Sequence, residues 1–449
     1  MPLNRRGFLT LAGTAVAGTA LTACSTQSPT STTSSTPAAA PSSAASSDAA
    51  PSWEAAKNTG SGQISLLTPD FGGDEGKTAL EDGVLKPYFD GTDYTYNVDY
   101  TDWGNLQTKL ATAITSTLPE VMMLGAGWVE PYAYEQVLGE IPESVYKDLG
   151  IPDNLFSQCR YEGKVYALPY VVDLRVNIAR GDFLEEKGIK ELPASLDELR
   201  ELAKELTIPG KRLGIDLFTT RINQTWVQLM RAYGGQLFNE DGTKVAFDDG
   251  TGEAALQWIL DVVKDGSADP AQKGVTGTPR PWQQGKAAID FVNSSMWANF
   301  TSQTPDLITE DAMKFFVLPN SEAGKDPVMY MGGTLLALSA EPEFPEVSQG
   351  LLNWFEQPEP LVAALKVNGK APAMPGVESD PELQKNRMMT FGVENMQYAT
   401  AFDGGTAAWM DIRSELPKQI DNALAGNQTA KETIDAMVEL CNAAMAKVA

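Results

Sequence analysis

The pattern of apolar and polar positions changes twice along the chain, near residue 24 and again near residue 60. Residues 8–21 are almost wholly apolar, residues 25–50 are almost wholly Ser, Thr, Pro and Ala, and apolar runs return at short intervals from residue 63. The middle stretch cannot bury a hydrophobic core, so we expect it to form a flexible tether. The chain therefore divides into an apolar leader, a polar tether and a long folded body.

The folded body alternates strand-like and helix-like patterns. Short apolar or alternating runs predict strands at residues 64–67, 94–100, 119–124, 287–292 and 315–318. Helical spacing predicts helices at residues 80–89, 106–116, 252–264 and 429–448, and Ser195 and Glu198 stand at capping-box spacing before another. Strands that alternate with helices are typical of an α/β fold, and we expect its sheets to be parallel.

Composition and charge exclude several classes of function. The 449 residues suit two domains plus a tail. The absence of histidine excludes Ser-His-Asp and Cys-His catalysis and His-based zinc sites, so only carboxylate chemistry survives as an enzymatic option. The formal net charge of -25 disfavours binding to nucleic acid or to an anionic membrane surface. Composition leaves carboxylate-only chemistry open, although we expect no enzyme, no metal and no cofactor in this chain.

The N-terminus has the features of an export signal. Arg5 and Arg6 precede an apolar stretch of about 14 residues, which is too short to span a bilayer that needs roughly 20 helical residues. Residues 1–23 are therefore predicted to be a signal peptide. The paired arginines resemble the twin-arginine signal, but Asn4 stands where Ser or Thr is usual, so the Sec route stays open.

Cys24 closes a sequence, Leu-Thr-Ala-Cys, that resembles the bacterial lipobox. A diacylglycerol on Cys24 would hold the protein at the outer face of the cell membrane, and residues 24–60 would link this lipid to the body. The alternative is an unmodified cysteine after an ordinary signal peptide. Two further cysteines, Cys159 and Cys441, either form a disulfide or stay as buried thiols, because spacing alone does not decide this.

Six short motifs occur in the order found in one family of receptors. They are LPEVM at 118–122, YEGKVYALP at 161–169, LPASLDEL at 192–199, GKAAI at 285–289, GGTLLA at 332–337 and AGNQT at 425–429. Each motif is weak alone, but the set resembles the bacterial extracellular solute-binding proteins of the maltose-binding type (family 1). In this family Asp is usual where Glu120 stands here.

The resemblance implies a two-lobed α/β fold, the type II periplasmic-binding-protein-like fold, with a ligand cleft between lobes that are joined by hinge crossings. The crossings are placed near Asp173, Leu318 and Met374. The N-lobe would comprise residues 60–174 plus 319–374, and the C-lobe residues 175–318 plus 375–449.

The same resemblance implies the function of a lipid-anchored substrate-binding protein of an ABC importer. A small carbohydrate, such as the disaccharide trehalose or maltose, would be captured by lobe closure and delivered to the permease subunits. We expect a monomer outside the cytoplasm that contacts the membrane only through its N-terminal lipid.

A sugar cleft should combine charged groups for the hydroxyls with aromatic faces for the C–H surfaces. Such residues occur here at strand ends, at helix starts, at the predicted crossings and in the glycine-rich return strand. Each has a plainer alternative in a solvated turn, in core packing or in an ion pair between the lobes. The candidate contacts are Asp70, Trp103, Trp128, Asp173, Arg175, Trp226, Trp282, Asn293, Trp297, Gly333, Trp409 and Arg413.

Three rival functions remain at this stage. The first is a secreted glycoside hydrolase that uses a carboxylate pair, although no local signature marks an acid and a nucleophile. The second is the same fold with another ligand, such as glycerol phosphate, a polyamine or an iron chelate. A phosphate would need a cluster of cationic or backbone donors, whereas the tryptophan-rich loops favour a sugar. The third is a surface scaffold without a ligand.

Overall fold

The computed structural model describes residues 52–71, 73–219, 221–272, 278–401 and 403–448. The predicted signal peptide at residues 1–23 and the predicted lipid site Cys24 lie outside them. The folded body is the compact unit Ala50–Ala449. Residues 52–59, which the sequence prediction gave to the tether, form helix α1 (Ser52–Thr59), and the Trp53 side chain is buried.

One end of the body is built on three parallel strands. β1 (Ser61–Pro69) pairs with β2 (Asp93–Thr101) and with β3 (Val121–Gly125), which confirms three predicted strands. α4 (Trp103–Ile114) confirms a predicted helix, and residues 80–89 are helical but include a π-helical turn, η1 (Glu81–Leu85). The other helices at this end are α2 (Asp74–Leu80), α3 (Lys86–Phe89), α5 (Val129–Tyr134), α6 (Glu143–Tyr146), α12 (Pro345–Phe355) and α13 (Pro358–Asn368).

The other end has its own parallel pair, β7 (Leu213–Asp216) and β8 (Ala287–Asn293). The helices near this pair are α7 (Gly181–Lys187), α8 (Leu196–Leu206), α9 (Ile222–Ala232), α10 (Thr251–Lys264), α11 (Trp297–Gln303), α15 (Trp409–Leu424) and α16 (Ala430–Met445). The remaining elements are α14 (Arg387–Glu394), the hairpin β4 (Arg160–Tyr161) and β5 (Lys164–Val165), and the short strands β11 (Ala371–Pro372) and β12 (Ala399–Ala401).

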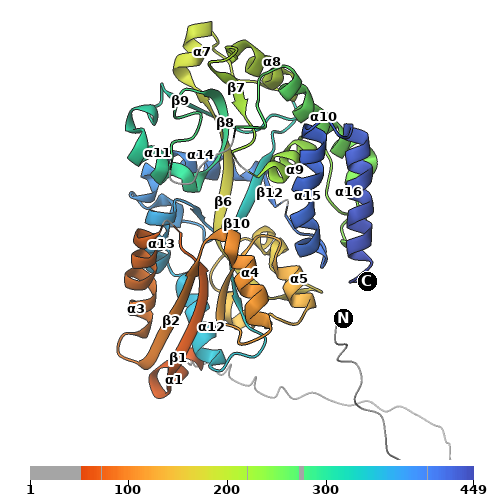
Figure 1. Ribbon diagram of the computed structural model, residues 1–449. Helices are drawn as coiled ribbons and strands as arrows, with labels where there is room; N and C mark the ends of the chain where they lie inside the picture. Colours follow the sequence, from red (N-terminus) through yellow and green to blue (C-terminus); the bar gives the residue numbers. More distant parts are fainter. Residues whose placement is uncertain (1–51, 72, 220, 273–277, 402, 449) are drawn as a thin grey trace, which may run out of the picture. The chain divides into compact units, whose positions relative to one another are not determined.

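Two long strands connect the ends. β6 (Ala167–Arg180) pairs first with β10 (Met329–Leu338) and then with β8 and β9 (Met313–Phe316). Figure 1 shows β6 and β10 side by side between β1, β2 and α4 at one end and β7, β8 and α8 at the other. The partner of β6 changes between Asp173, opposite Gly332, and Arg175, opposite Asn293. This change coincides with the first predicted crossing.

The expectation of wholly parallel sheets is wrong. β10 runs antiparallel to both β3 and β6, and β6 runs antiparallel to β8 and β9. The physical reason is that β6 leaves the first end of the body and β10 returns to it. The two strands lie side by side, so they run in opposite directions. The main path of the sheet is therefore mixed, in the order β2-β1-β3-β10-β6-β8-β7.

Two hydrophobic cores correspond to the two ends. The first core surrounds β1, β3 and the first half of β6, and the second surrounds β7, α9, α10, α15 and α16. Met388 and Met389 of α14 pack in the first core, as do Trp282 and Phe300. The exact residue boundaries of the two lobes stay a prediction.

Local details bear on two sequence expectations. Ser195 caps α8 by accepting a hydrogen bond from the Glu198 amide at 3.2 Å, whereas the Glu198 carboxylate accepts from Ala194. Cys159 and Cys441 are free thiols, buried in the first and the second core respectively, so they form no disulfide. Among the described residues, no helix is both long and apolar enough to cross a membrane.

Candidate functional site

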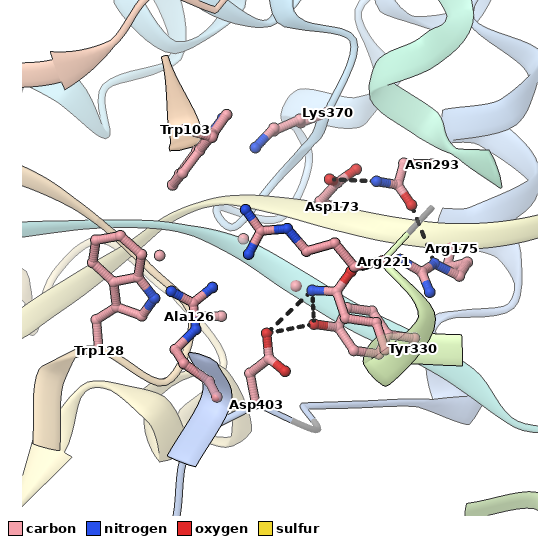
Figure 2. Close-up of a pocket in the computed structure, with 15 residues that line it drawn as sticks. Trp103, Ala126, Trp128, Asp173, Arg175, Arg221, Asn293, Tyr330, Lys370 and Asp403 are labelled. Carbon is pink, nitrogen blue, oxygen red and sulfur yellow. Dashed lines mark hydrogen bonds between the residues drawn. The ribbon is translucent and has the colours of Figure 1, made fainter. Parts of the chain in front are cut away.

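A cavity of about 200 Å³ lies where the two ends meet on β6 and β10. Its walls come from the loops after β2 and β3, the middle of β6 and β10, the end of β8, the starts of α9 and α15, and the residues before β11 and after β12 (Figure 2). The lining residues are Trp103, Gly125, Ala126, Trp128, Asp173, Arg175, Arg221, Gln224, Asn293, Tyr330, Gly332, Gly333, Lys370, Asp403 and Arg413.

Two tryptophans supply apolar surface. Trp103 is the first residue of α4, and Asp102 caps that helix by accepting from the amides of Gly104 and Asn105. Trp128 follows β3 in a tight turn, and its indole lies over Gly125, where an added Cβ would come within 3.0 Å of Nε1. A glycine at position 125 therefore allows the Trp128 ring to lie close against the strand end.

A hydrogen-bonded chain runs along the polar side of the pocket. Asn293 donates to Asp173 Oδ2 at 3.2 Å and accepts from Arg175 Nε at 3.3 Å. Arg175 Nη2 donates to Gln224 Oε1 at 2.9 Å. These hydrogen bonds hold the Arg175 guanidinium in place through neutral amide oxygens.

The chain continues from Gln224 to the residue after β12. Gln224 Nε2 donates to the Tyr330 hydroxyl at 2.9 Å and to Asp403 Oδ2 at 3.3 Å. The Tyr330 hydroxyl donates to the same Asp403 oxygen at 2.8 Å. Figure 2 shows these bonds as dashed lines that join side chains from α9, from β10 and from the segment after β12.

Three buried polar atoms of the pocket are left without a hydrogen-bond partner within the described part of the chain. They are Asp173 Oδ1, Arg175 Nη1 and Asp403 Oδ1. Buried polar atoms in folded proteins are nearly always satisfied, so atoms of this kind beside a cavity indicate groups that a ligand would complete. Two of them are acceptors and one is a donor, which suits a ligand with several hydroxyl groups.

Lys370 and Arg413 bring positive charge next to the aromatic rings. The Lys370 ammonium lies 5.1 Å from the Trp103 ring centroid and 5.3 Å from that of Phe71, and it donates to Thr334 Oγ1 at 3.3 Å. The Arg413 guanidinium lies 5.0 Å from the Trp128 ring centroid and donates to Gln107. Burial lowers the pKa of both cations, and nearby carboxylates offset part of that effect.

Gly127 and Gly404 are in close contact, and both line a second cavity of about 250 Å³. A Cβ added at Gly127 would lie 2.6 Å from the Gly404 nitrogen, and one added at Gly404 would lie 2.6 Å from the Gly127 Cα. Both residues also have positive φ, 80° and 93°, which side chains disfavour. Asp403 lines both cavities, so the two cavities adjoin at this residue.

The pocket brings together most of the residues predicted as ligand contacts. These are Trp103, Trp128, Asp173, Arg175, Asn293, Gly333 and Arg413. They come from six separate segments of the chain, and only Asp173 and Arg175 are near neighbours in sequence. Residues chosen for their positions at strand ends and crossings therefore lie together around one pocket.

Three predicted tryptophans lie elsewhere. Trp226, Trp282 and Trp409 are fully buried and do not line the pocket. The Trp226 indole donates to the Gly252 carbonyl at 3.0 Å, Trp282 packs against Phe300, and Trp409 packs against Phe238. Each indole offers a large apolar surface, and at these positions it faces a core instead of the cavity.

Asp70 and Trp297 also lie outside the pocket. Asp70 lines a separate cavity of about 460 Å³ with Lys77, Tyr100 and Lys109. Trp297 starts α11 and packs, partly buried, against the first core. The strand-end position of Asp70 and the loop position of Trp297 were therefore not sufficient to place them in this pocket.

Sequence reasoning missed several lining residues. They are Gly125, Ala126, Arg221, Gln224, Tyr330, Gly332, Lys370 and Asp403. Two of them had a readable signal, since Gln224 stands in the same helix start as Trp226 and Gly332 adjoins Gly333. Lys370 had none, because a lone lysine after a helix is usually exposed. Within the described ranges, no group of three or more Cys, Asp or Glu side chains is placed to hold a metal ion.

The family described as bacterial extracellular solute-binding protein matches residues 74–360. The chain belongs to this family. The resemblance seen in the six motifs is thereby confirmed. The pocket of this solute-binding protein draws residues both from the matched region and from the C-terminal part that follows it, which supplies Lys370, Asp403 and Arg413.

Curated relatives are distant. The diacetylchitobiose binding protein DasA of Streptomyces coelicolor is 24% identical over 292 residues, which is 62% of this chain and 66% of that protein. Proteins of Brucella abortus that are named only as binding proteins are 25% identical over 277 residues, 57% of this chain and 66% of theirs. The chain thus spans just under two thirds of the length of these relatives.

Solved structures show the same fold. An ABC transporter solute binding protein from Thermotoga lettingae, bound with α-D-tagatose, aligns with a TM-score of 0.72 at 19% identity, covering 86% of this chain and 100% of that one. An ABC substrate-binding protein from Listeria monocytogenes, in complex with cycloalternan, aligns with a TM-score of 0.73 at 18% identity and the same coverage. The predicted two-lobed fold of this solute-binding protein is confirmed.

Proposed function

We propose that this solute-binding protein captures a small carbohydrate between its two lobes and presents it to the permease of an ABC importer. The single observation that carries the proposal is the pocket itself. It combines two tryptophans with two carboxylates that each keep one buried oxygen without a partner. Aromatic faces suit the C–H surfaces of a sugar ring and carboxylates suit its hydroxyls, so the pocket has both parts of a carbohydrate site.

The ligands of related structures support this proposal. The Thermotoga protein holds D-tagatose, and the Listeria protein holds cycloalternan. The cavity here, about 200 Å³, lies below the roughly 300–1,000 Å³ of pockets that bury drug-sized ligands. This size favours one sugar unit in the main pocket. A disaccharide such as trehalose or maltose would have to extend past Asp403 into the second cavity.

The cellular setting is also part of the proposal. A lipid on Cys24 would retain the monomer at the outer face of the membrane after export by the twin-arginine or the Sec route. The lobes would close on the ligand because the ligand contacts both of them, and the closed form would dock on the permease. Binding makes and breaks no covalent bond, so no sugar should be altered by incubation with the protein.

A thermal-shift screen of residues 50–449 against a panel of sugars tests the proposal. A ligand that binds only the folded state raises the melting temperature, by an amount equivalent to about 2.7 kcal/mol at 100 times its Kd. We expect at least one sugar to do so, with its recovery unchanged by chromatography afterwards. A panel in which no sugar stabilises the body, or one in which a sugar is hydrolysed, contradicts the proposal.

A further inference from the structure

The charge of the pocket is opposite in sign to that of the whole chain. The chain has 59 acidic and 34 basic residues. The pocket lining has more cations than carboxylates: Arg175, Arg221, Lys370 and Arg413 face only Asp173 and Asp403. An excess of positive charge in a cavity between the lobes calls for a cause beyond composition.

The four cations are also unpaired with carboxylates. Within the described ranges, none of them has a carboxylate oxygen within 4.0 Å, although many surface lysines do. Arg175 contacts amide oxygens of Asn293 and Gln224, and Arg413 contacts the amide oxygen of Gln107. Lys370 contacts a hydroxyl and two aromatic rings. Neutral dipoles therefore hold these charges in position without neutralising them.

Burial makes this arrangement unfavourable in the empty protein. Arg175 is 2% exposed and Lys370 is 5% exposed. Removing a charge from water is costly unless an opposite charge compensates it, and burial accordingly lowers the pKa of both groups. A bound anion would supply the missing compensation in the same space.

The two carboxylates do not fill this role, because each is already engaged. Asp173 Oδ2 accepts from Asn293, and Asp403 Oδ2 accepts from Tyr330 and Gln224. Their second oxygens remain available to accept hydrogen bonds from hydroxyl groups. The pocket thus offers acceptors for hydroxyls and, separately, unpaired cations.

We propose that the ligand is an anionic sugar, of about one sugar unit, that carries a carboxylate or a phosphate. Its negative group faces Lys370 and Arg221, whose charged ends both point into the middle of the pocket in Figure 2. Its hydroxyls face Asp173 and Asp403, and its ring lies near Trp103. This inference rests on the proposed function and specifies its ligand. A neutral sugar would satisfy the hydrogen bonds but leave the excess charge uncompensated.

Matched ligand sets test the inference. Glucose, galactose and mannose are each compared by calorimetry with the corresponding uronic acid and 6-phosphate, with inorganic phosphate and succinate as anions that lack a sugar ring. We expect an acid or a phosphate to bind at least about tenfold more tightly than its neutral parent, since hydrogen bonds to charged groups are the stronger ones. The carboxylate and phosphate arms show which anion the pocket takes.

The possible failures are distinct. Neutral sugars that bind as tightly as their acids overturn the anion inference and leave the proposed sugar receptor standing. Binding of phosphate or succinate without any sugar overturns the proposed function. Binding of no member of the panel contradicts both.

Two variants sharpen the test. Lys370→Met should reduce affinity for the anionic sugar at least about tenfold and should raise the melting temperature of the ligand-free protein, because it removes an uncompensated buried charge. Arg221→Gln changes an exposed residue, so it should weaken the same ligand while leaving the fold intact. Lys366→Met, on the exposed surface of the preceding helix α13, is the matched control and should change neither property.

A structural role for Lys370 predicts the opposite pattern. If Lys370→Met lowers the melting temperature and Arg221→Gln binds the anionic sugar as tightly as the unmodified protein, the pocket cations do not serve the ligand. Unchanged affinity in both variants overturns the inference directly.

Discussion

Arg280 and Arg175 are two buried arginines whose surroundings differ in one respect. Arg280 is 7% exposed, and two of its nitrogens donate to the two oxygens of Asp290 at 2.6 and 2.7 Å. Arg175 is 2% exposed and donates only to neutral amides. Burial lowers the pKa of Arg175, whereas at Arg280 the Asp290 carboxylate more than offsets burial and raises the pKa.

Arg280 has the surroundings of a structural charge, whereas we propose that Arg175 is a charge that serves binding. Arg280 forms a complete ion pair that links the segment before β8 to β8 itself, and Thr219 accepts a further bond from it. Nothing remains for a ligand to add there. Arg175 keeps one nitrogen without a partner beside a cavity, so its interactions are completed only when the cavity is filled.

The largest effect is expected for Arg280→Met. This change leaves the Asp290 carboxylate, which is 0% exposed, without its counter-charge, and breaking a buried pair in this way destabilises by about 3–5 kcal/mol. Urea unfolding followed by tryptophan fluorescence measures the loss. The double variant Arg280→Met/Asp290→Leu is the control and should recover part of it. A loss below about 1 kcal/mol would contradict a structural role for the pair.

Arg175→Met is the matched test at the other arginine. It breaks no close ion pair but leaves the amide oxygens of Asn293 and Gln224 without their donor, so we expect it to lower the free energy of unfolding less than Arg280→Met does, by about 1–2 kcal/mol. Ligand affinity should instead fall, by roughly 10- to 150-fold for a charge-assisted hydrogen bond worth about 1.5–3 kcal/mol. Calorimetry with the ligand from the sugar panel measures this. Equal destabilisation by both variants would remove the distinction.

Glu356→Gln tests a third kind of buried ionisable group, and we expect a smaller change in the free energy of unfolding. Glu356 is 0% exposed, and neither carboxyl oxygen has a hydrogen-bond partner among the described residues. Burial raises the pKa of Glu356 well above its ordinary value, which favours the neutral form of this carboxyl in the folded protein. Here the protein avoids the unpaired charge by retaining the proton.

The sign of the pH dependence follows from this raised pKa. The unfolded chain releases the proton of Glu356 near pH 4.3, whereas the folded protein keeps it, so the folded state loses stability as pH rises above that value. Gln cannot ionise, and the Glu356→Gln variant should become more stable than the parent, with a difference that grows from pH 4.5 to pH 7.5. Urea unfolding at the two pH values measures it. A difference independent of pH would mean that Glu356 is not buried as the neutral acid.

Much of the fold could be predicted from the sequence, because burial of one face makes apolar residues recur with the period of a helix or of a strand. The strands at 64–67, 94–100, 119–124 and 287–292 and the helices at 106–116, 252–264 and 429–448 all appear close to their predicted positions. The direction of β6 and β10 was not accessible, because a run of apolar residues has the same pattern in parallel and antiparallel pairing. The π-helical turn at η1 likewise leaves no separate mark in the apolar spacing.

The site was predicted only in part for a related reason. The position just after a strand end brings Trp103 and Trp128 into the wall of this pocket, since the ends of neighbouring strands meet at one edge of a sheet. At a helix start such as that of α9 or α15, the side chain is free to face either the cavity or the core, and Trp226 and Trp409 face the core. Lys370 and Arg221 become site residues only through tertiary packing, which no local spacing records.

The contact between Gly127 and Gly404 has a consequence for how this receptor can diverge. Because neither position tolerates a side chain, mutation can scarcely change this contact, which forms part of the wall of the second cavity. A ligand longer than one sugar unit would enter that cavity, so its wall is constrained by backbone, whereas the charged side chains of the main pocket can be replaced without a backbone clash. Descendants of this protein would be expected to change which molecule they import more readily than how long a molecule they accept.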